Sequence, residues 1–199
     1  SSAGPDSTRT DYWRMTLPHA PYLFAMAIGE FSVVKDEWRG REVSYYVDKE
    51  YEKYARLIFG KTPQMMEFFS NRLGVEYPWE KYSQVVVQDF VSGAMENTTA
   101  TIHMGAFQHD ARQHLDNTYE DYVSHEVFHQ WFGDLVTCES WANLTLNEGF
   151  ATYGEVLWRE HAYGANDGMR HHLTDRQSYL FEARRRQLPL IHHHHEAAE

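Results

Sequence analysis

The feature that most constrains this chain is the segment His125-Glu126-Val127-Phe128-His129. In a helix, residues four positions apart lie on one face, so His125 and His129 can direct their imidazole rings at a single ion. Glu126 lies beside this face and can hold a water molecule without binding the ion. Two histidines arranged in this way around a glutamate are typical of zinc peptidases, in which the glutamate is the general base.

A second segment, Asn147-Glu148-Gly149-Phe150-Ala151, supplies a further ligand of the type that a catalytic zinc ion needs. The 18 residues between His129 and Glu148 suffice for one helix to end and for a second to place its first turn alongside. We therefore expect one Zn²⁺ per chain, bound by His125, His129 and Glu148, with one position open for water. The chain has 13 histidines, so the histidine pair could arise by chance, but the second segment argues against chance.

The ligand set predicts the chemistry. Two neutral imidazoles and one carboxylate leave the ion with net positive charge, so it can polarise a carbonyl and lower the pKa of its bound water toward ~7. Glu126 would take the proton from that water during attack and deliver it to the leaving amine. Glu155 lies seven positions after Glu148 and could accept a hydrogen bond from a ligand histidine. The alternative for Glu155 is a solvent-exposed helix residue.

The segment from Gly93 to Asn97 is the third informative stretch, and we expect it to contact substrate through Gly93, Ala94, Met95, Glu96 and Asn97. Its two small residues would let a substrate backbone approach closely. If the segment forms a sheet edge, its main chain can pair with an extended peptide. Glu96 would then bind the α-ammonium group of the peptide. The alternative is a loop residue without a ligand.

Composition excludes some functions and leaves others open. The net charge of −11 argues against a nucleic-acid partner. No apolar run is long enough to span a membrane, and the single cysteine, Cys138, excludes an internal disulfide. The compartment stays open, because cytoplasmic, periplasmic and extracellular locations all fit. The chain starts without Met, so we expect a piece of a longer protein. The histidines at 192–195 could bind metal adventitiously.

Periodicity and turn residues predict an α+β chain. The expected strands cover 22–34 (one or two buried strands), 42–47, 84–90 and 98–104, and the expected helices cover 50–59, 62–73, 118–132, 147–161 and 166–185. A turn is expected at Trp38-Arg39-Gly40. The run Val85–Val87 favours a central strand buried on both faces, and Thr62 and Thr118 are candidate helix caps. Three further histidines match no ligand spacing and are interpreted as ordinary core or surface residues: His103, His109 and His114.

Together these segments resemble the zinc aminopeptidases of the aminopeptidase N and leukotriene hydrolase family, which are gluzincins. Gly93–Asn97 matches the exopeptidase motif of that family. The zinc signature is matched by His125–Gly133, the 18-residue gap and Asn147–Ala151. The resemblance covers roughly residues 17–190. It implies a thermolysin-like zincin catalytic domain, with a small mixed β-sheet packed against the helices that carry the zinc site.

The resemblance also implies a division of the chain. Residues 1–42 would be a linker and the last strands of a truncated N-terminal β-domain, and residues 43–199 a catalytic domain truncated at its C-terminal end. By motif, His125, His129 and Glu148 would bind zinc, Glu126 would be the base, and Glu96 would bind the free amine of the substrate.

Three departures from the family are visible. Members stabilise the oxyanion with a tyrosine well beyond the zinc glutamate, and no tyrosine after Glu148 lies in a matching context; the candidates are Tyr153, Tyr163 and Tyr179. We therefore expect the chain to stop before that residue. The N-terminal β-domain, which provides a second amine-binding side chain, and the C-terminal helical domain are expected to be missing. Thr145 stands where members commonly carry tryptophan.

The leading hypothesis is a zinc metallo-aminopeptidase that hydrolyses the N-terminal peptide bond of peptides by a zinc-activated water. Its partners would be peptides with a free N-terminus and the missing domains. One alternative is a thermolysin-like zinc endopeptidase, in which Gly93–Asn97 would have no function. The other is a zinc-binding fragment that is inactive in isolation. The preferred N-terminal residue and the oligomeric state stay open.

Overall fold

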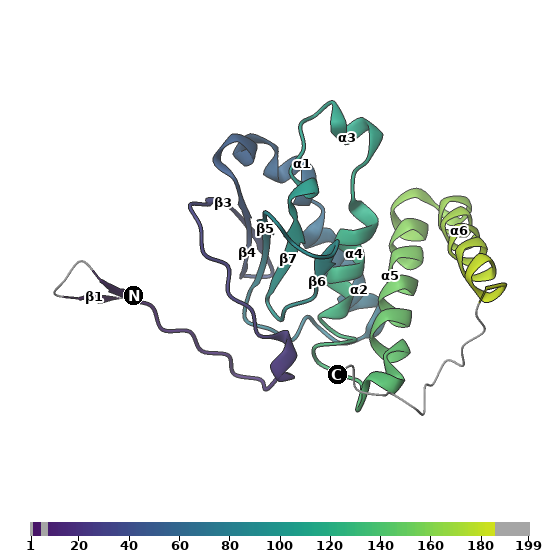
Figure 1. Ribbon diagram of the computed structural model, residues 1–199, viewed down its shortest axis with the longest axis horizontal. Helices are drawn as coiled ribbons and strands as arrows, with labels where there is room; N and C mark the ends of the chain where they lie inside the picture. The colour runs from purple at the N-terminus through teal and green to yellow at the C-terminus, as the bar shows by residue number, and fades with distance from the viewer. Residues whose placement is uncertain (1, 5–7, 186–199) are drawn as a thin grey trace.

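The computed structural model describes residues 2–4 and 8–185 (Figure 1). The tract His192–His195, for which adventitious metal binding is expected, lies outside the described residues. Two short strands near the N-terminus, β1 (Ser2–Ala3) and β2 (Arg9–Thr10), pair with one another. They stand apart from the five-stranded sheet that carries the rest of the fold (Figure 1).

The main sheet is mixed and has the strand order β3-β4-β5-β7-β6. Its strands are β3 (Ser32–Trp38), β4 (Arg41–Val47), β5 (Tyr82–Val87), β6 (Ala94–Met95) and β7 (Ala100–Met104). The strand β5 runs parallel to both β4 and β7, whereas β3 and β6 pair antiparallel at the two edges. The central position expected for β5 is confirmed.

The predicted turn at Trp38-Arg39-Gly40 joins β3 to β4. Arg39 and Gly40 both adopt positive φ angles, 46° and 77°, which two-residue hairpin turns of type I′ require. The alternate residues Val43, Tyr45 and Val47 of β4 are fully buried, because strand geometry places them on one face toward the core.

The helices begin with the 3₁₀ turn η2 (Lys49–Tyr54), α1 (Ala55–Phe59) and α2 (Thr62–Leu73). A loop with η1 (Pro21–Leu23) precedes the sheet, and η3 (Gly105–Phe107) and α3 (Gln113–Asp116) follow β7. After these come α4 (Glu120–His129), η4 (Trp141–Asn143), α5 (Thr145–Tyr163) and α6 (Ala165–Ala183). This mixed sheet with its helices confirms the expected α+β class.

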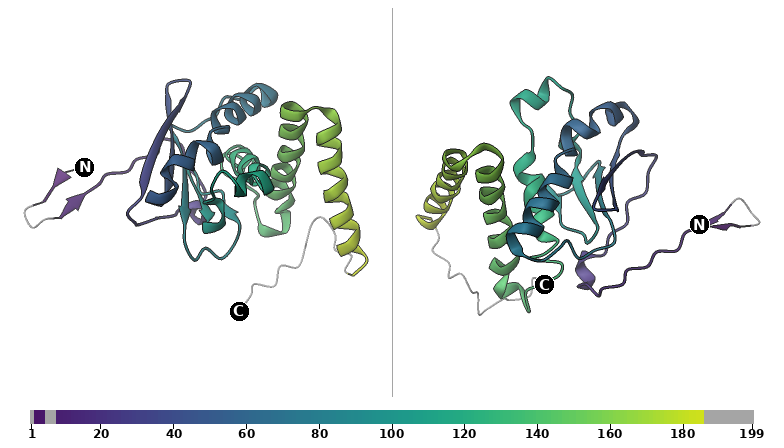
Figure 2. Two further views of the ribbon diagram at one scale, coloured as in Figure 1. Left: turned by 90° about the horizontal axis from the view of Figure 1, so that it is seen from above. Right: turned by 180° about the vertical axis from the view of Figure 1, so that it is seen from behind.

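The helices α4, α5 and α6 follow one another away from the sheet (Figures 1 and 2). The helix α4 packs against α2 and α5, and α5 packs against α6. Aromatic rings fill the contact between α2 and α4, where Phe69 of α2 lies edge-on to both Phe128 and Trp131. As a result, α4 is held rigidly between the core and α5.

Four local predictions need correction. Thr62 lies inside α2 and donates its hydroxyl to Oε1 of Gln84 at 2.7 Å, so it is a core contact and no N-cap. The residue that precedes α4 is Tyr119, in the left-handed conformation (φ 53°), while Thr118 only accepts from the Glu120 amide at 3.3 Å. The strand β5 starts two residues before the predicted position 84 and ends at Val87 instead of at residue 90. The strand β7 starts at Ala100 instead of at residue 98, because Thr99 has a left-handed backbone conformation.

The largest correction concerns residues 22–34. A strand begins only at Ser32, and no described strand pairs with residues 24–31. Phe24, Met26 and Ile28 are 75%, 74% and 84% exposed. Their alternation has the period of a strand, but that pattern does not specify a neighbouring strand or a surface to cover the apolar face. The prediction of burial was therefore wrong for this part of the chain.

The contact between α4 and α5 depends on the absence of a side chain at Gly154. A Cβ atom there would lie 2.7 Å from Cγ and 2.9 Å from Cβ of Phe128, at the rigid base of a buried ring. We expect Gly154→Val to lower the free energy of unfolding by about 1–3 kcal/mol through overpacking. Urea denaturation would measure this loss. The control is Tyr153→Val, which introduces valine at the exposed position immediately before Gly154. If both variants were equally stable, overpacking against Phe128 would be contradicted.

Candidate active site

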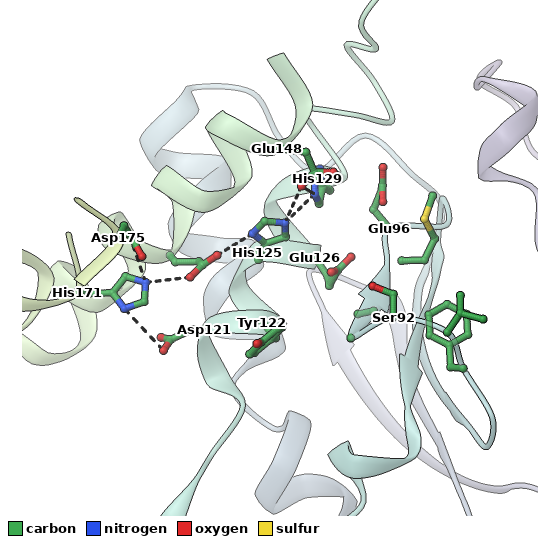
Figure 3. Close-up of a pocket in the computed structure, with 16 residues that line it drawn as sticks. Ser92, Glu96, Asp121, Tyr122, His125, Glu126, His129, Glu148, His171 and Asp175 are labelled. Carbon is green, nitrogen blue, oxygen red and sulfur yellow. Dashed lines mark hydrogen bonds and ion pairs between the residues drawn. The ribbon is translucent and has the colours of Figure 1, made fainter. Parts of the chain in front are cut away.

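Two helices bring three potential ligand atoms together. Nε2 of His125 and Nε2 of His129 in α4 lie 2.9 Å apart (Figure 3). Oε2 of Glu148, in the first turn of α5, lies 3.3 Å from the former and 3.5 Å from the latter. The four-residue spacing aligns the histidines on one helix face, and the packing of α5 against α4 supplies the carboxylate.

The two separations from Glu148 fit a single bound metal ion, and the two histidine nitrogens lie somewhat closer together than ligands of such an ion. Donor atoms that surround a tetrahedral ion at about 2.0–2.2 Å lie about 3.3–3.5 Å from one another. Within the described part of the chain, no other group of three His, Cys, Asp or Glu side chains has its ligand atoms within 4.8 Å of one another. The histidines at 103, 109 and 114 do not join the cluster. His103 is buried between Phe59 and Phe107, and His109 hydrogen bonds to His114 at 2.8 Å.

The second nitrogen of each ring is held from outside the cluster. Nδ1 of His125 lies 2.7 Å from Oε1 of Glu155, and Nδ1 of His129 lies 2.9 Å from the carbonyl oxygen of Phe132. If each Nδ1 carries a proton that it donates there, each Nε2 keeps its lone pair for a metal ion. The predicted hydrogen bond between Glu155 and a histidine of the pair is confirmed. The carbonyl of Phe132 could not be read from the sequence, since it depends on the sharp bend at Gly133.

Gly133 allows that bend. Its φ of 133° is a conformation that side chains rarely adopt, and a Cβ atom there would lie 3.0 Å from Nδ1 of His129. The chain can therefore fold back beneath the histidine and present a carbonyl to its ring.

The cluster favours positive charge. Burial alone would lower the pKa of His125, but hydrogen bonds to Glu148 and Glu155 raise it to about 10. Hydrogen bonds from His125 and His129 hold the pKa of Glu148 well below its usual range. Both shifts arise because the carboxylates of Glu148 and Glu155 place negative charge beside the histidine pair.

Glu126 differs from the other carboxylates of the site. It is 5% exposed, and its Oε2 atom has no hydrogen-bond partner within the described chain. Burial raises the pKa of Glu126 to about 7, although nearby His129 and His125 oppose this shift. A buried carboxylate with a free lone pair beside a cavity is able to accept a proton from a molecule in that cavity.

A cavity of about 630 Å³ is lined by residues from all three sequence segments that were expected to form the site. It is lined by His125, Glu126, His129 and Glu148, and also by four of the five expected substrate-contacting residues: Gly93, Ala94, Met95 and Glu96. The segment includes β6, which pairs with β7 on one side and forms the edge of the sheet.

Asn97 is the exception among the expected substrate-contacting residues. It does not line the cavity, because its Nδ2 donates to the carbonyl oxygen of Leu23 at 3.1 Å. Glu96 lines the cavity, whereas Asn97 contacts η1.

Five polar residues of the cavity wall were not expected from the sequence: Ser92, Asp121, Tyr122, His171 and Asp175. Figure 3 shows Asp121, His171 and Asp175 on one side of the histidine pair and Glu96 on the other. Tyr122 lies four positions before Glu126 in α4, so helical spacing could have placed it. His171 lies in α6, and no local pattern connects it with α4.

Comparison with known proteins decides the family. Residues 58–196 match the sequence model of the Peptidase family M1 domain. The chain belongs to peptidase family M1. The expected resemblance to zinc aminopeptidases of the aminopeptidase N type is thereby confirmed. The family also supports the α+β mixed-sheet class that the structure contains.

Curated relatives of this M1 chain carry aminopeptidase names. Glutamyl aminopeptidase of Sus scrofa is 32% identical over 162 residues, which are 76% of this chain and 17% of that protein. Endoplasmic reticulum aminopeptidase 1 of Rattus norvegicus is 37% identical over 154 residues, 74% of this chain and 16% of that protein. Aminopeptidase 2 of Candida albicans is 31% identical over 165 residues, 77% of this chain and 18% of that protein. The M1 chain thus spans about a sixth of the length of these relatives. None of its described helices is both long and apolar enough to cross a membrane.

Proposed function

We propose that this M1 chain carries the catalytic centre of a zinc aminopeptidase that hydrolyses the N-terminal bond of peptides. One observation carries the proposal: the histidine pair and Glu148 converge on one point in the cavity that also contains Glu126 and Glu96. Membership of a peptidase family and relatives named as aminopeptidases support the same reaction class. A thermolysin-like fold and a domain boundary near residue 42 stay predictions.

The donor set fits zinc. Catalytic zinc sites commonly have three protein ligands from histidine and carboxylate side chains, and they keep a fourth position for water or substrate. Here His125, His129 and Glu148 would be the ligands. When bound, the ion would supply Lewis acidity that polarises the scissile carbonyl and acidifies a water molecule. Glu155 and the carbonyl of Phe132 would hold the two imidazole rings in place.

Glu126 would act as the general base. It is buried beside the ligands, and its free Oε2 atom can accept the proton of an attacking water molecule. The carboxylic acid formed in this way can then donate the proton to the nitrogen of the leaving amine. The two histidine ligands and the base come from one stretch of α4, so the backbone geometry of that helix fixes their relative positions, whereas Glu148 comes from α5.

Glu96 would restrict the reaction to N-terminal bonds. It is 6% exposed and lines the cavity, in which no described Lys or Arg side chain takes part. The α-ammonium group of a bound peptide would then be the cation that faces the carboxylate of Glu96. The free edge of β6 would pair with the backbone of the peptide. This arrangement favours the exopeptidase over the endopeptidase alternative, because an internal peptide segment has no cation at that point.

The test compares a peptide that has a free N-terminus with the same peptide acetylated. We expect hydrolysis of the free peptide with release of its first residue, identified by mass spectrometry, and no cleavage of the acetylated one. In Glu96→Ala, we expect kcat/KM on the free peptide to fall about 10²-fold, since truncating one partner of a buried charged pair costs ~3 kcal/mol. Exposed Glu139→Ala is the control. Internal cleavage of the acetylated peptide, undiminished in Glu96→Ala, would refute amine recognition.

A further inference from the structure

A chain of contacts connects α6 to the candidate metal centre. Oε1 of Glu155 lies 2.7 Å from Nδ1 of His125, and Oε2 of the same carboxylate lies 2.9 Å from Nε2 of His171. Both oxygens of Glu155 are therefore occupied, one by a proposed metal ligand and the other by α6. His171 also lines the cavity (Figure 3).

The position of His171 follows from how α6 meets α5. Gly168, His171 and Asp175 are spaced so that they share one face of α6. At Gly168, a Cβ atom would lie 3.1 Å from both N and Cα of Glu160, so the two helices approach closely there. Gly168 is also the one buried residue in the described part of α6. Apolar burial thus contributes little to this contact, and the polar contact of His171 comes one turn later.

A second carboxylate faces the other side of the His171 ring. Its Nδ1 atom faces Oδ2 of Asp121 in α4 at 3.9 Å. Arg159 of α5 holds both oxygens of Asp121, at 2.6 and 2.8 Å, and also contacts Asp167 of α6 at 3.2 Å. Bidentate pairs of this kind have defined geometry. The His171 ring therefore lies between a carboxylate of α5 and a carboxylate of α4.

We propose that His171 is a positioning residue for the metal centre: it fixes the carboxylate of Glu155, which in turn orients the imidazole of His125. The inference rests on the proposed function, because it assumes that His125 binds the metal. Without His171, Glu155 would keep one partner and could rotate away from His125. Removing the outer partner of a ligand histidine typically weakens metal binding by about 10- to 100-fold. His171 acts one contact further out, so we expect about tenfold.

The experiment measures the zinc dissociation constant by competition with a chromophoric chelator, for the full chain with His192–His195 replaced by alanine. His171→Ala should bind zinc about tenfold more weakly than the parent. His171→Gln keeps an N–H donor toward Glu155 and should bind within about twofold of the parent. His172→Ala, which changes the exposed neighbouring histidine of α6, should bind like the parent. The melting temperature of each metal-free protein is recorded in parallel.

A purely structural role predicts a different result. If His171→Ala lowered the melting temperature but bound zinc as tightly as His172→Ala, positioning by His171 would be refuted while the metal centre stood. Equal weakening in the alanine and glutamine variants would also contradict it, since the retained donor should rescue binding. A parent chain without zinc would instead refute the proposed metal centre, and this inference with it.

Discussion

Replacing Glu126 by glutamine is expected to lower kcat by about 10²–10⁴-fold while zinc binding is retained. Glutamine has nearly the same shape as glutamate, so the buried site should keep its packing. Its amide oxygen cannot take up the proton of an attacking water molecule, and the leaving amine would receive none in return. The effect should be confined to turnover, because Glu126 is no member of the three-residue ligand cluster.

The measurement is steady-state hydrolysis of a peptide with a free N-terminus, made on the chain or on a longer protein that contains it, whichever turns the peptide over. Zinc content is determined on the same samples. Glu160→Gln, the same change at an exposed position of α5, is the control and should leave kcat unchanged. Full activity in Glu126→Gln would refute the assignment of Glu126 as the base. Loss of zinc together with activity would mean that Glu126 supports the ligands.

The local parts of the site could be predicted from the sequence. The histidine pair follows from helical spacing, and Glu155 follows from its position two turns after Glu148 on the same helix. Both relations lie within one helix or between consecutive helices. The sheet edge at β6 was also suggested by the short Gly93–Asn97 segment, whereas the contact of Asn97 with the carbonyl of Leu23 joins distant parts of the chain and has no local signal.

The relations that could not be predicted join distant segments. His171 reaches the site because α6 packs on α5, and no periodicity within α6 indicates which face meets Glu155. Thr62 is of a residue type that often caps a helix N-terminus. Its hydroxyl instead donates to the buried side chain of Gln84, which is distant in the sequence. The segment around Phe24, Met26 and Ile28 has the alternation of a strand, yet burial requires a partner that alternation does not identify.

The second large effect concerns the metal itself. His129 is 1% exposed, and its Nε2 atom lies within 3.5 Å of the ligand atoms of His125 and Glu148. Removing one of three protein ligands leaves too few donors for a stable four-coordinate site. We expect about one zinc ion per parent chain and none above background in His129→Ala. Because His129 is buried, Glu148→Ala is needed as a second variant; its side chain is 48% exposed and less important for folding.

The most direct test is therefore zinc stoichiometry by elemental analysis after gel filtration. It uses the parent chain, His129→Ala, Glu148→Ala and the exposed control His172→Ala, with His192–His195 replaced by alanine in all four and folding checked by circular dichroism. We predict one zinc ion per chain in the parent and the control, and none in the two ligand variants. A folded parent without zinc, or folded ligand variants that keep it, would contradict the metal centre on which this account depends.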